Sequence, residues 1–288
     1  MTKRIVFLTQ DSMDGYVCDD DVAIAPFADA GLDVETISWR AEAAWSTFDA
    51  VIIRSTWDYQ HDHQAFFDTL RKISAATRLA NPLALMRWNM DKRYLAELAR
   101  DGVATVPTVF GEGLAPGQLP GMLESVTEPH VIKPVISAGA ERTFRIEPGM
   151  SEAQLAPIVA AHQKSAWMWQ PFLTRITTEG EYSLFYFSGE YSHAILKTPK
   201  SGDFRVQEEF GGVIQAITPA AELRAAADQT LASLDSPPLY ARVDLVRGNR
   251  DDAWQLIELE LIEPSLYLRM DEQASARFAH AVNAWLSQ

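Results

Sequence analysis

The sequence feature that most constrains the fold is a pair of apolar segments near the end of the chain, residues 239–246 and 254–262, with charged side chains at alternate positions. Because side chains of a strand point alternately to its two faces, this pattern predicts two strands, each with one apolar and one charged face. The connector 247–253 is rich in turn-forming residues, so we expect an antiparallel hairpin. Its apolar face would pack on a core, and its charged face would line a cleft or meet solvent.

The expected register of this hairpin brings charges together. If Asp244 lies opposite Glu258, then Arg242 lies opposite Glu260. Three carboxylates then crowd one patch, and like charges directly opposite one another destabilise a sheet. Oxygen ligands at this density suit Mg²⁺, which prefers one or two carboxylates plus phosphate oxygens. A solvated acidic face without a ligand explains the pattern equally well.

The beginning of the chain has the strand and helix alternation of a parallel α/β unit. No G-x-G-x-x-G follows its first strand, so this Rossmann-like unit lacks the phosphate loop of dinucleotide-binding proteins. We expect the unit to span residues 1–88. Its expected elements are strands at 4–9, 33–38 and 49–54 and helices at 21–30 and 62–76.

Two further units are expected, a central subdomain over 89–168 and a C-terminal subdomain over 169–288. Ser151 and Gln154 have the spacing of a capping box, which predicts that a helix begins there. The other expected helices are at 89–101, from Thr218-Pro219 onward, and at 270–286. The other expected strands are at 104–110, 129–134, 167–172, 181–187 and 190–197, with a Gly/Pro-rich turn stretch at 111–121.

Charge and cysteine content exclude several classes of protein. The 25 basic and 39 acidic side chains give a net charge of -14, which opposes binding to nucleic acid or to an anionic membrane. Cys18 is the single cysteine, so no disulfide framework can form. The N-terminus has too short an apolar run for a signal peptide, and no segment is long enough to span a membrane. We therefore expect a cytoplasmic protein.

Basic residues occur in settings that suit phosphate binding. Lys133 ends an apolar strand and precedes the small-residue loop 135–140, whose backbone N–H groups could approach phosphates. Lys92 begins a predicted helix, where its charge opposes the helix dipole and favours an external anion. Lys197 and Arg205 precede a flexible segment. Each of these side chains, taken alone, is equally explained as a solvated charge.

The segment WQPFL (169–173) is an apolar strand that breaks at a proline, which suits a slot for a purine. Glu181 begins the next expected strand and could accept hydrogen bonds from ribose hydroxyls. An ordinary turn beside an incidental acid is the alternative interpretation.

The ordered set DK, KP with a small-residue loop, QPF, GE, K, R, R-x-D and E-x-E-x-x-x-P resembles the ATP-grasp superfamily over roughly residues 89–265. The resemblance implies an α/β chain, α+β in its C-terminal half, with a Rossmann-like pre-ATP-grasp domain and two subdomains that clamp ATP. It implies ATP and Mg²⁺ as cofactors. The glutamate at 260 stands where the superfamily commonly has asparagine, and the loop has Gly139 as its only glycine.

The resemblance also assigns roles to individual residues. Those implied to bind ATP are Lys92, Lys133, Ser137, Gly139, Gln170, Pro171, Phe172, Leu173 and Glu181. Those implied to hold magnesium are Asp244, Glu258 and Glu260. Those implied to steady the transferring phosphoryl group are Lys197, Arg205 and Arg242.

Within the superfamily, the chain looks most similar to the prokaryotic glutathione synthetase-like branch, which includes the O-ureido-serine cyclo-ligase of cycloserine biosynthesis and uncharacterised relatives. The segments IRSTWDY (53–59), WNMDKRYL (88–95), GDFRVQ (202–207) and ELELIEPSLYL (258–268) carry this likeness. By this resemblance, and because open α/β sheets bind ligands at the carboxyl ends of strands, a small amino-acid-like substrate would contact Arg54, Ser55, Thr56, Asp58 and Ser265.

The expected activity is an ADP-forming carbon–nitrogen ligation through an acyl phosphate, either with ring closure, as in the cyclo-ligase, or without it. A glutathione synthetase-like or peptide-ligase-like enzyme, a small-molecule kinase and a nucleotide-binding regulator without catalysis are the alternatives. A homo-oligomer is compatible with the sequence.

Overall fold

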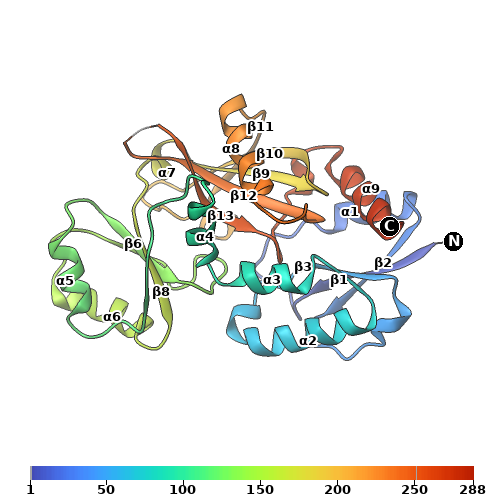
Figure 1. Ribbon diagram of the computed structural model, residues 1–288, viewed down its shortest axis with the longest axis horizontal. Coiled ribbons are helices and arrows are strands. Elements are labelled where there is room, and N and C mark those ends of the chain that lie inside the picture. The colour runs from blue at the N-terminus through green and yellow to red at the C-terminus, as the bar shows by residue number, and fades with distance from the viewer. Residues whose placement is uncertain (1, 251) are drawn as a thin grey trace.

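The computed structural model describes residues 2–250 and 252–288, and their strands form three sheets that follow one another along the chain (Figure 1). The first sheet is parallel, as predicted, with the order β2-β1-β3-β4. Its elements are β1 (Lys3–Thr9), α1 (Asp21–Asp29), β2 (Leu32–Ser38), η1 (Trp45–Thr47), β3 (Ala50–Ser55), η2 (Tyr59–His61), α2 (His63–Ala76), β4 (Arg78–Ala80) and α3 (Leu83–Met90).

Alternate residues of β1 face opposite helical layers, which explains its uninterrupted apolar sequence. Val6 and Leu8 pack with residues of α2 and α3. Ile5 and Phe7 pack with α1 and with the C-terminal helix α9 (Ala274–Leu286). The last helix of the chain therefore completes the core of the first domain, and Figure 1 shows it beside α1.

The single helix predicted at 89–101 is wrong. The chain forms α3 and then α4 (Tyr94–Arg100), with Asp91 extended between them. The Asp91 carboxylate accepts a hydrogen bond from the backbone N–H of Arg93 at 3.0 Å, and the N–H of Lys92 donates to the carbonyl of Val135 at 2.9 Å. These bonds take the place of helical hydrogen bonds and separate the two helices. The domain boundary expected at residue 88 falls inside α3.

The central sheet has the order β5-β8-β6-β7 and is antiparallel. Its elements are β5 (Val109–Glu112), α5 (Gln118–Glu124), β6 (His130–Pro134), β7 (Phe144–Ile146), α6 (Glu152–His162) and β8 (Ala166–Pro171). The capping box of α6 is confirmed, since the Gln154 side chain accepts from the N–H of Ser151 at 2.9 Å.

Three expectations about this region need correction. The strand expected at 104–110 begins only at Val109, because Thr105 instead bridges to Leu256 of the third sheet. The stretch expected to be only turns contains the start of α5. The expected boundary between 168 and 169 cuts β8, which pairs along its length with β5 and β6.

The third sheet is antiparallel with the order β11-β10-β9-β12-β13. Its elements and neighbours are α7 (Arg175–Thr178), β9 (Glu181–Phe187), β10 (Glu190–Thr198), η3 (Glu208–Phe210), β11 (Val213–Ile217), α8 (Ala221–Ala232), β12 (Tyr240–Arg247), β13 (Trp254–Glu260) and η4 (Leu268–Met270). The helix expected from Thr218-Pro219 onward begins two residues later, because α8 starts at Ala221.

The register predicted for the closing hairpin is confirmed. Asp244 pairs with Glu258, and Arg242 pairs with Glu260. The apolar face of this hairpin packs in the core that it shares with α4 and α8. Across residues 2–250 and 252–288, no helix combines the length and hydrophobicity that a membrane crossing requires.

Candidate active site

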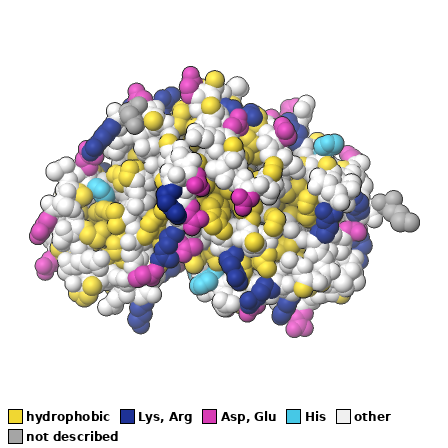
Figure 2. Space-filling view, in the orientation of Figure 1, with side chains coloured by type: hydrophobic (Ala, Val, Ile, Leu, Met, Phe, Trp, Pro, Cys, Tyr) yellow, Lys and Arg dark blue, Asp and Glu magenta, His cyan; other side chains and the backbone are white. Residues whose placement is uncertain are grey.

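A cavity of ≈ 670 Å³ is lined by residues of all three units of the chain. In Figure 2 the outline of the molecule is notched between the lobe of the central sheet and the first domain, and charged side chains gather above this notch. Most of the predicted site residues line the cavity, although the sequence places them far apart. They are Lys92, Lys133, Ser137, Gly139, Gln170, Pro171, Phe172, Leu173, Glu181, Lys197, Arg205, Arg242, Asp244, Glu258, Glu260 and Ser265.

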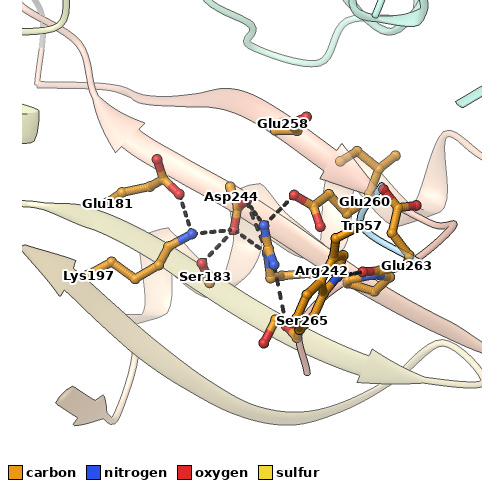
Figure 3. A network of polar contacts seen from close by, with 12 residues as sticks. Trp57, Glu181, Ser183, Lys197, Arg242, Asp244, Glu258, Glu260, Glu263 and Ser265 are labelled. Atoms are coloured by element: carbon orange, nitrogen blue, oxygen red, sulfur yellow. Dashed lines mark hydrogen bonds and ion pairs between the residues drawn. The ribbon is translucent and has the colours of Figure 1, made fainter. Parts of the chain in front are cut away.

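Arg242 lies between two acids on the charged face of β12 and β13 (Figure 3). Its Nε is 3.1 Å from both carboxylate oxygens of Asp244, and its Nη2 donates to Glu260. Its Nη1 donates to the carbonyl of Ser265 at 3.3 Å. Asp244 is 1% exposed and Arg242 is 9% exposed, so solvent screens this pair weakly.

Lys197 extends the network across β9 and β10. Its Nζ pairs with Glu181 and lies 3.5 Å from Asp244, which also accepts from the Ser183 hydroxyl. Burial raises the pKa of Glu181, against the opposing charge of Lys197. The Glu181 carboxylate is thus engaged by a lysine in this structure, whereas the sequence suggested that it is free to bind ribose.

A second basic group faces Glu258, which lies apart from the Arg242 network in Figure 3. The Nζ of Lys92 is 3.0 Å from Glu258 and donates to the carbonyl of Ser137 at 2.7 Å. Burial lowers the pKa of the Lys133 ammonium, against the opposing charge of Glu258. Lys92 therefore ties the acidic strand to the small-residue loop that follows β6.

Paired cations offset most of the expected repulsion among the three carboxylates. Glu258 pairs with Lys92, and both Asp244 and Glu260 pair with Arg242. Some repulsion remains at Glu260, whose pKa is raised to about 7 by burial, against the opposing charge of Arg242, and by the charges of Glu258 and Asp244. Within the described residues, no group of three histidine, cysteine, aspartate or glutamate side chains is arranged to hold a metal ion by itself. The sequence placed Arg242 on this face but did not reveal that Lys92 and Lys197 reach the acids from other elements.

Side chains of the preceding helices hold β13, which is the edge strand of its sheet. The Asn89 amide donates to the carbonyl of Leu259 at 2.7 Å and accepts from the N–H of Leu261 at 2.9 Å. The Tyr94 hydroxyl bonds both backbone groups of Leu259. These bonds act as a further strand would and fix the positions of Glu258 and Glu260. Asn89 and Tyr94 flank Lys92, but a single sequence gives no sign that they reach β13.

The proline-terminated strand forms an apolar wall of the cavity. Phe172 and Leu173 follow the end of β8 and pack with Val206 and Val246. The Gln170 side chain donates to the Thr108 hydroxyl at 2.9 Å. Arg205, predicted to steady a phosphoryl group, is held by Asp203, whose Oδ2 is 2.7 Å from its Nη2.

The structure does not place four of the predicted substrate residues on the cavity surface. Arg54 is 2% exposed and pairs with Asp20 at 2.7 Å, and it donates to the carbonyl of Pro264 at 3.3 Å, so it ties the first domain to the segment after β13. Ser55 bonds Thr9, and Asp58 accepts from the indole N–H of Trp39. Thr56 is fully buried. The side chains at this end of the cavity are instead Tyr16, Trp57, Tyr59, Gln60 and Glu263.

Glu263 is a cavity residue that the sequence analysis missed. Burial, followed by the charge of Glu260, raises its pKa to about 8, against the opposing effect of the Tyr59 hydroxyl. The indole N–H of Trp57 donates to its backbone carbonyl at 2.9 Å. The signal was an additional acid three residues beyond Glu260, directly before a proline.

Comparison with known proteins identifies the family. A family model for the N-terminal domain of the D-cycloserine synthetase DcsG matches residues 5–81. The cycloserine biosynthesis protein DcsG of Streptomyces lavendulae is 33% identical over 273 residues, which cover 88% of each chain. A crystal structure of D-cycloserine synthetase DcsG superposes with a TM-score of 0.85 at 30% identity and covers 98% of this chain and 99% of that chain.

More distant structures share the fold. The ATP-grasp ligase PsnB, solved with Mg and ADP, has a TM-score of 0.65 at 15% identity over 98% of both chains. D-alanine–D-alanine ligase from Bacillus anthracis has a TM-score of 0.65 at 14% identity over 99% of this chain and 95% of that chain. The protein has the ATP-grasp fold and belongs to the family that includes the D-cycloserine synthetase DcsG.

Proposed function

We propose that the protein is an ATP-dependent carbon–nitrogen ligase that converts the carboxylate of an amino-acid-like substrate into an acyl phosphate and releases ADP. The observation that carries this proposal is the charged face of β12 and β13, which forms the cavity floor. There the acids Asp244, Glu258 and Glu260 each pair with Lys92 or Arg242. Phosphoryl transfer depends on positioning and on charge stabilisation, which such a floor provides.

Residues in different parts of the cavity would have different roles. Lys92 and Lys133, beside the loop with Ser137 and Gly139, would neutralise nucleotide phosphates. Gln170 to Leu173 would form the purine slot, with Glu181 beside the ribose. Arg242, Lys197 and Arg205 would stabilise charge on the transferring group. Ion pairs with acids already engage Lys92, Lys197, Arg205 and Arg242, so a bound nucleotide would replace contacts that these four side chains make.

The donor set fits a magnesium ion that arrives with the nucleotide. Mg²⁺ keeps few protein ligands and takes phosphate oxygens and water as the others, so a preformed cage of three acids is not needed. Glu258, Glu260 and Asp244 would hold it. When bound, the ion would neutralise the charge that develops on the phosphates.

The likeness to a D-cycloserine synthetase supports an intramolecular version of the reaction. In that version, a nitrogen of the substrate attacks its own acyl phosphate, a carbon–nitrogen bond forms, and phosphate leaves. O-ureidoserine is the substrate to test first.

The test is ADP release with Mg-ATP and a panel of amino acids and derivatives, with and without hydroxylamine. Hydroxylamine captures an acyl phosphate as a hydroxamate but does not react with a phosphate ester, so it separates a ligase from a kinase. We expect ADP, phosphate and hydroxamate. Stoichiometric AMP and pyrophosphate would contradict the proposal.

A further inference from the structure

Glu263 differs from the other acids of the cavity floor. The acids on β9, β12 and β13 that line the cavity each form an ion pair with a lysine or arginine. Within residues 2–250 and 252–288, Glu263 forms no ion pair, and the Tyr59 hydroxyl is a polar side-chain group that lowers its pKa. A carboxylate that is partly withdrawn from water without a cation is costly, and the raised pKa of Glu263, about 8, reflects this cost.

A second acceptor at this end of the cavity lies on Gln60. Gln60 lines the same cavity, and within the described residues its buried Oε1 has no hydrogen-bond partner. Three aromatic side chains complete this end of the cavity: Tyr59, Trp57 and Tyr16, the last two with ring centroids 5.5 Å apart. Figure 3 shows Trp57 beside Glu263. Unsatisfied acceptors among aromatic rings suit a cationic N–H donor, because both carboxylates and ring faces attract cations.

We propose that Glu263, with Gln60 and the aromatic rings of Tyr16, Trp57 and Tyr59, binds a primary ammonium group, so that the protein selects amino acids over carboxylic acids that lack this group. The proposal rests on the proposed function, because it names the part of the substrate that this end of the cavity holds. Glu260 and Glu263 line one cavity, and their charges act on each other. An ammonium bound at Glu263 would leave the carboxylate of the same amino acid inside the cavity that Glu260 and Arg242 also line.

The test uses pairs of acids that differ only in the ammonium group. The pairs are D-serine with 3-hydroxypropanoate, D-alanine with propanoate, and O-ureido-D-serine with 3-(ureidooxy)propanoate. ADP release gives kcat/KM for each member, and calorimetry in Mg-ADP measures binding. We expect the wild type to favour the ammonium-bearing member of an accepted pair by at least about 30-fold, the size expected for a partly buried charged contact.

Variants separate recognition from folding. Glu263→Gln should lower kcat/KM for the ammonium-bearing acid by about 30-fold or more, chiefly through KM, and should remove most of the preference. Glu263→Asp keeps a carboxyl group and should keep the preference with weaker binding. Glu272→Gln, at an exposed position outside the cavity, is the matched control and should behave as the wild type does.

The outcomes are distinguishable. Equal use of both members of each pair overturns the ammonium site, and so does an unchanged preference in Glu263→Gln. A wild type that is stabilised by nucleotide but neither binds nor turns over any ammonium-bearing acid overturns it as well. Failure of the proposed function looks different, because nucleotide would then give no thermal stabilisation, or ammonium-bearing acids would bind without ADP release.

Discussion

Changing Glu258 to Gln tests whether the charged hairpin stabilises or strains the empty protein. The sequence alone implies that three carboxylates repel one another, so removing one charge would leave stability unchanged or raise it. The structure implies the opposite, because Glu258 faces Lys92 at 3.0 Å and its charge also acts on Lys133. Glutamine keeps the shape of the side chain and removes the charge that these two ammonium groups face.

The size of the effect follows from exposure and from the remaining bonds. The Lys92 side chain is 8% exposed and that of Glu258 is 27% exposed, so water screens the pair only in part. Lys92 keeps its bond to the Ser137 carbonyl at 2.7 Å, and glutamine still offers a neutral acceptor. We expect a loss of about 1–2 kcal/mol in the free energy of unfolding, which is a fraction of the cost of breaking a buried pair. The melting temperature should fall by about 2–8 °C.

Thermal and denaturant unfolding of the nucleotide-free protein measure this change, with Glu272→Gln as the control. A variant as stable as the wild type, or more stable, would refute the ion-pair reasoning and restore the repulsion hypothesis. Turnover is a separate measurement. If Glu258 holds the metal, activity should fall by about 100-fold or more.

Three further predictions concern other parts of the molecule. Arg54→Met should lower the free energy of unfolding by about 3 kcal/mol, because Asp20 loses its buried partner, while the KM for ATP changes less than about twofold. Burial lowers the pKa of His162 and His193 to about 4, below the usual 6.5. The unfolded chain therefore binds protons more readily than the folded one, and each histidine should lower the free energy of unfolding by about 2 kcal/mol as the pH falls from 7 to 5. Denaturant unfolding at both pH values checks this. Replacing His162 or His193 with Gln should reduce the loss of unfolding free energy between pH 7 and pH 5, and replacing exposed His280 should not. Glu260→Asn should retain part of the activity and require more magnesium in a metal titration, whereas complete loss would show that Arg242 needs this partner.

The fold and the acidic strands could be predicted because their signals are local. Alternation along β12 and β13 predicted which side chains share a face. The pairing of Asp244 with Glu258 was a hypothesis about the hairpin register, and the structure has this register. The capping box at Ser151 is a local signal of the same kind.

The remaining features depend on contacts between distant segments. Asp91 and Lys92 break the expected helix because Lys92 bonds the chain at Val135, and no local pattern predicts that bond. Arg54 follows a parallel strand, where ligand-binding residues are expected, but it forms an ion pair with Asp20 inside the first domain. Glu263 lies in the cavity because the segment after β13 turns toward Trp57, which a strand period cannot foresee.

The measurement that tests the central claim most directly follows an oxygen atom. The accepted substrate is prepared with ¹⁸O in its carboxylate and incubated with Mg-ATP until product forms. An acyl phosphate carries one carboxylate oxygen, and attack by nitrogen expels that oxygen with the phosphate. The account predicts ADP and phosphate in equal amounts, with one ¹⁸O atom in each phosphate from fully labelled substrate. Unlabelled phosphate, or label found in AMP, would contradict it.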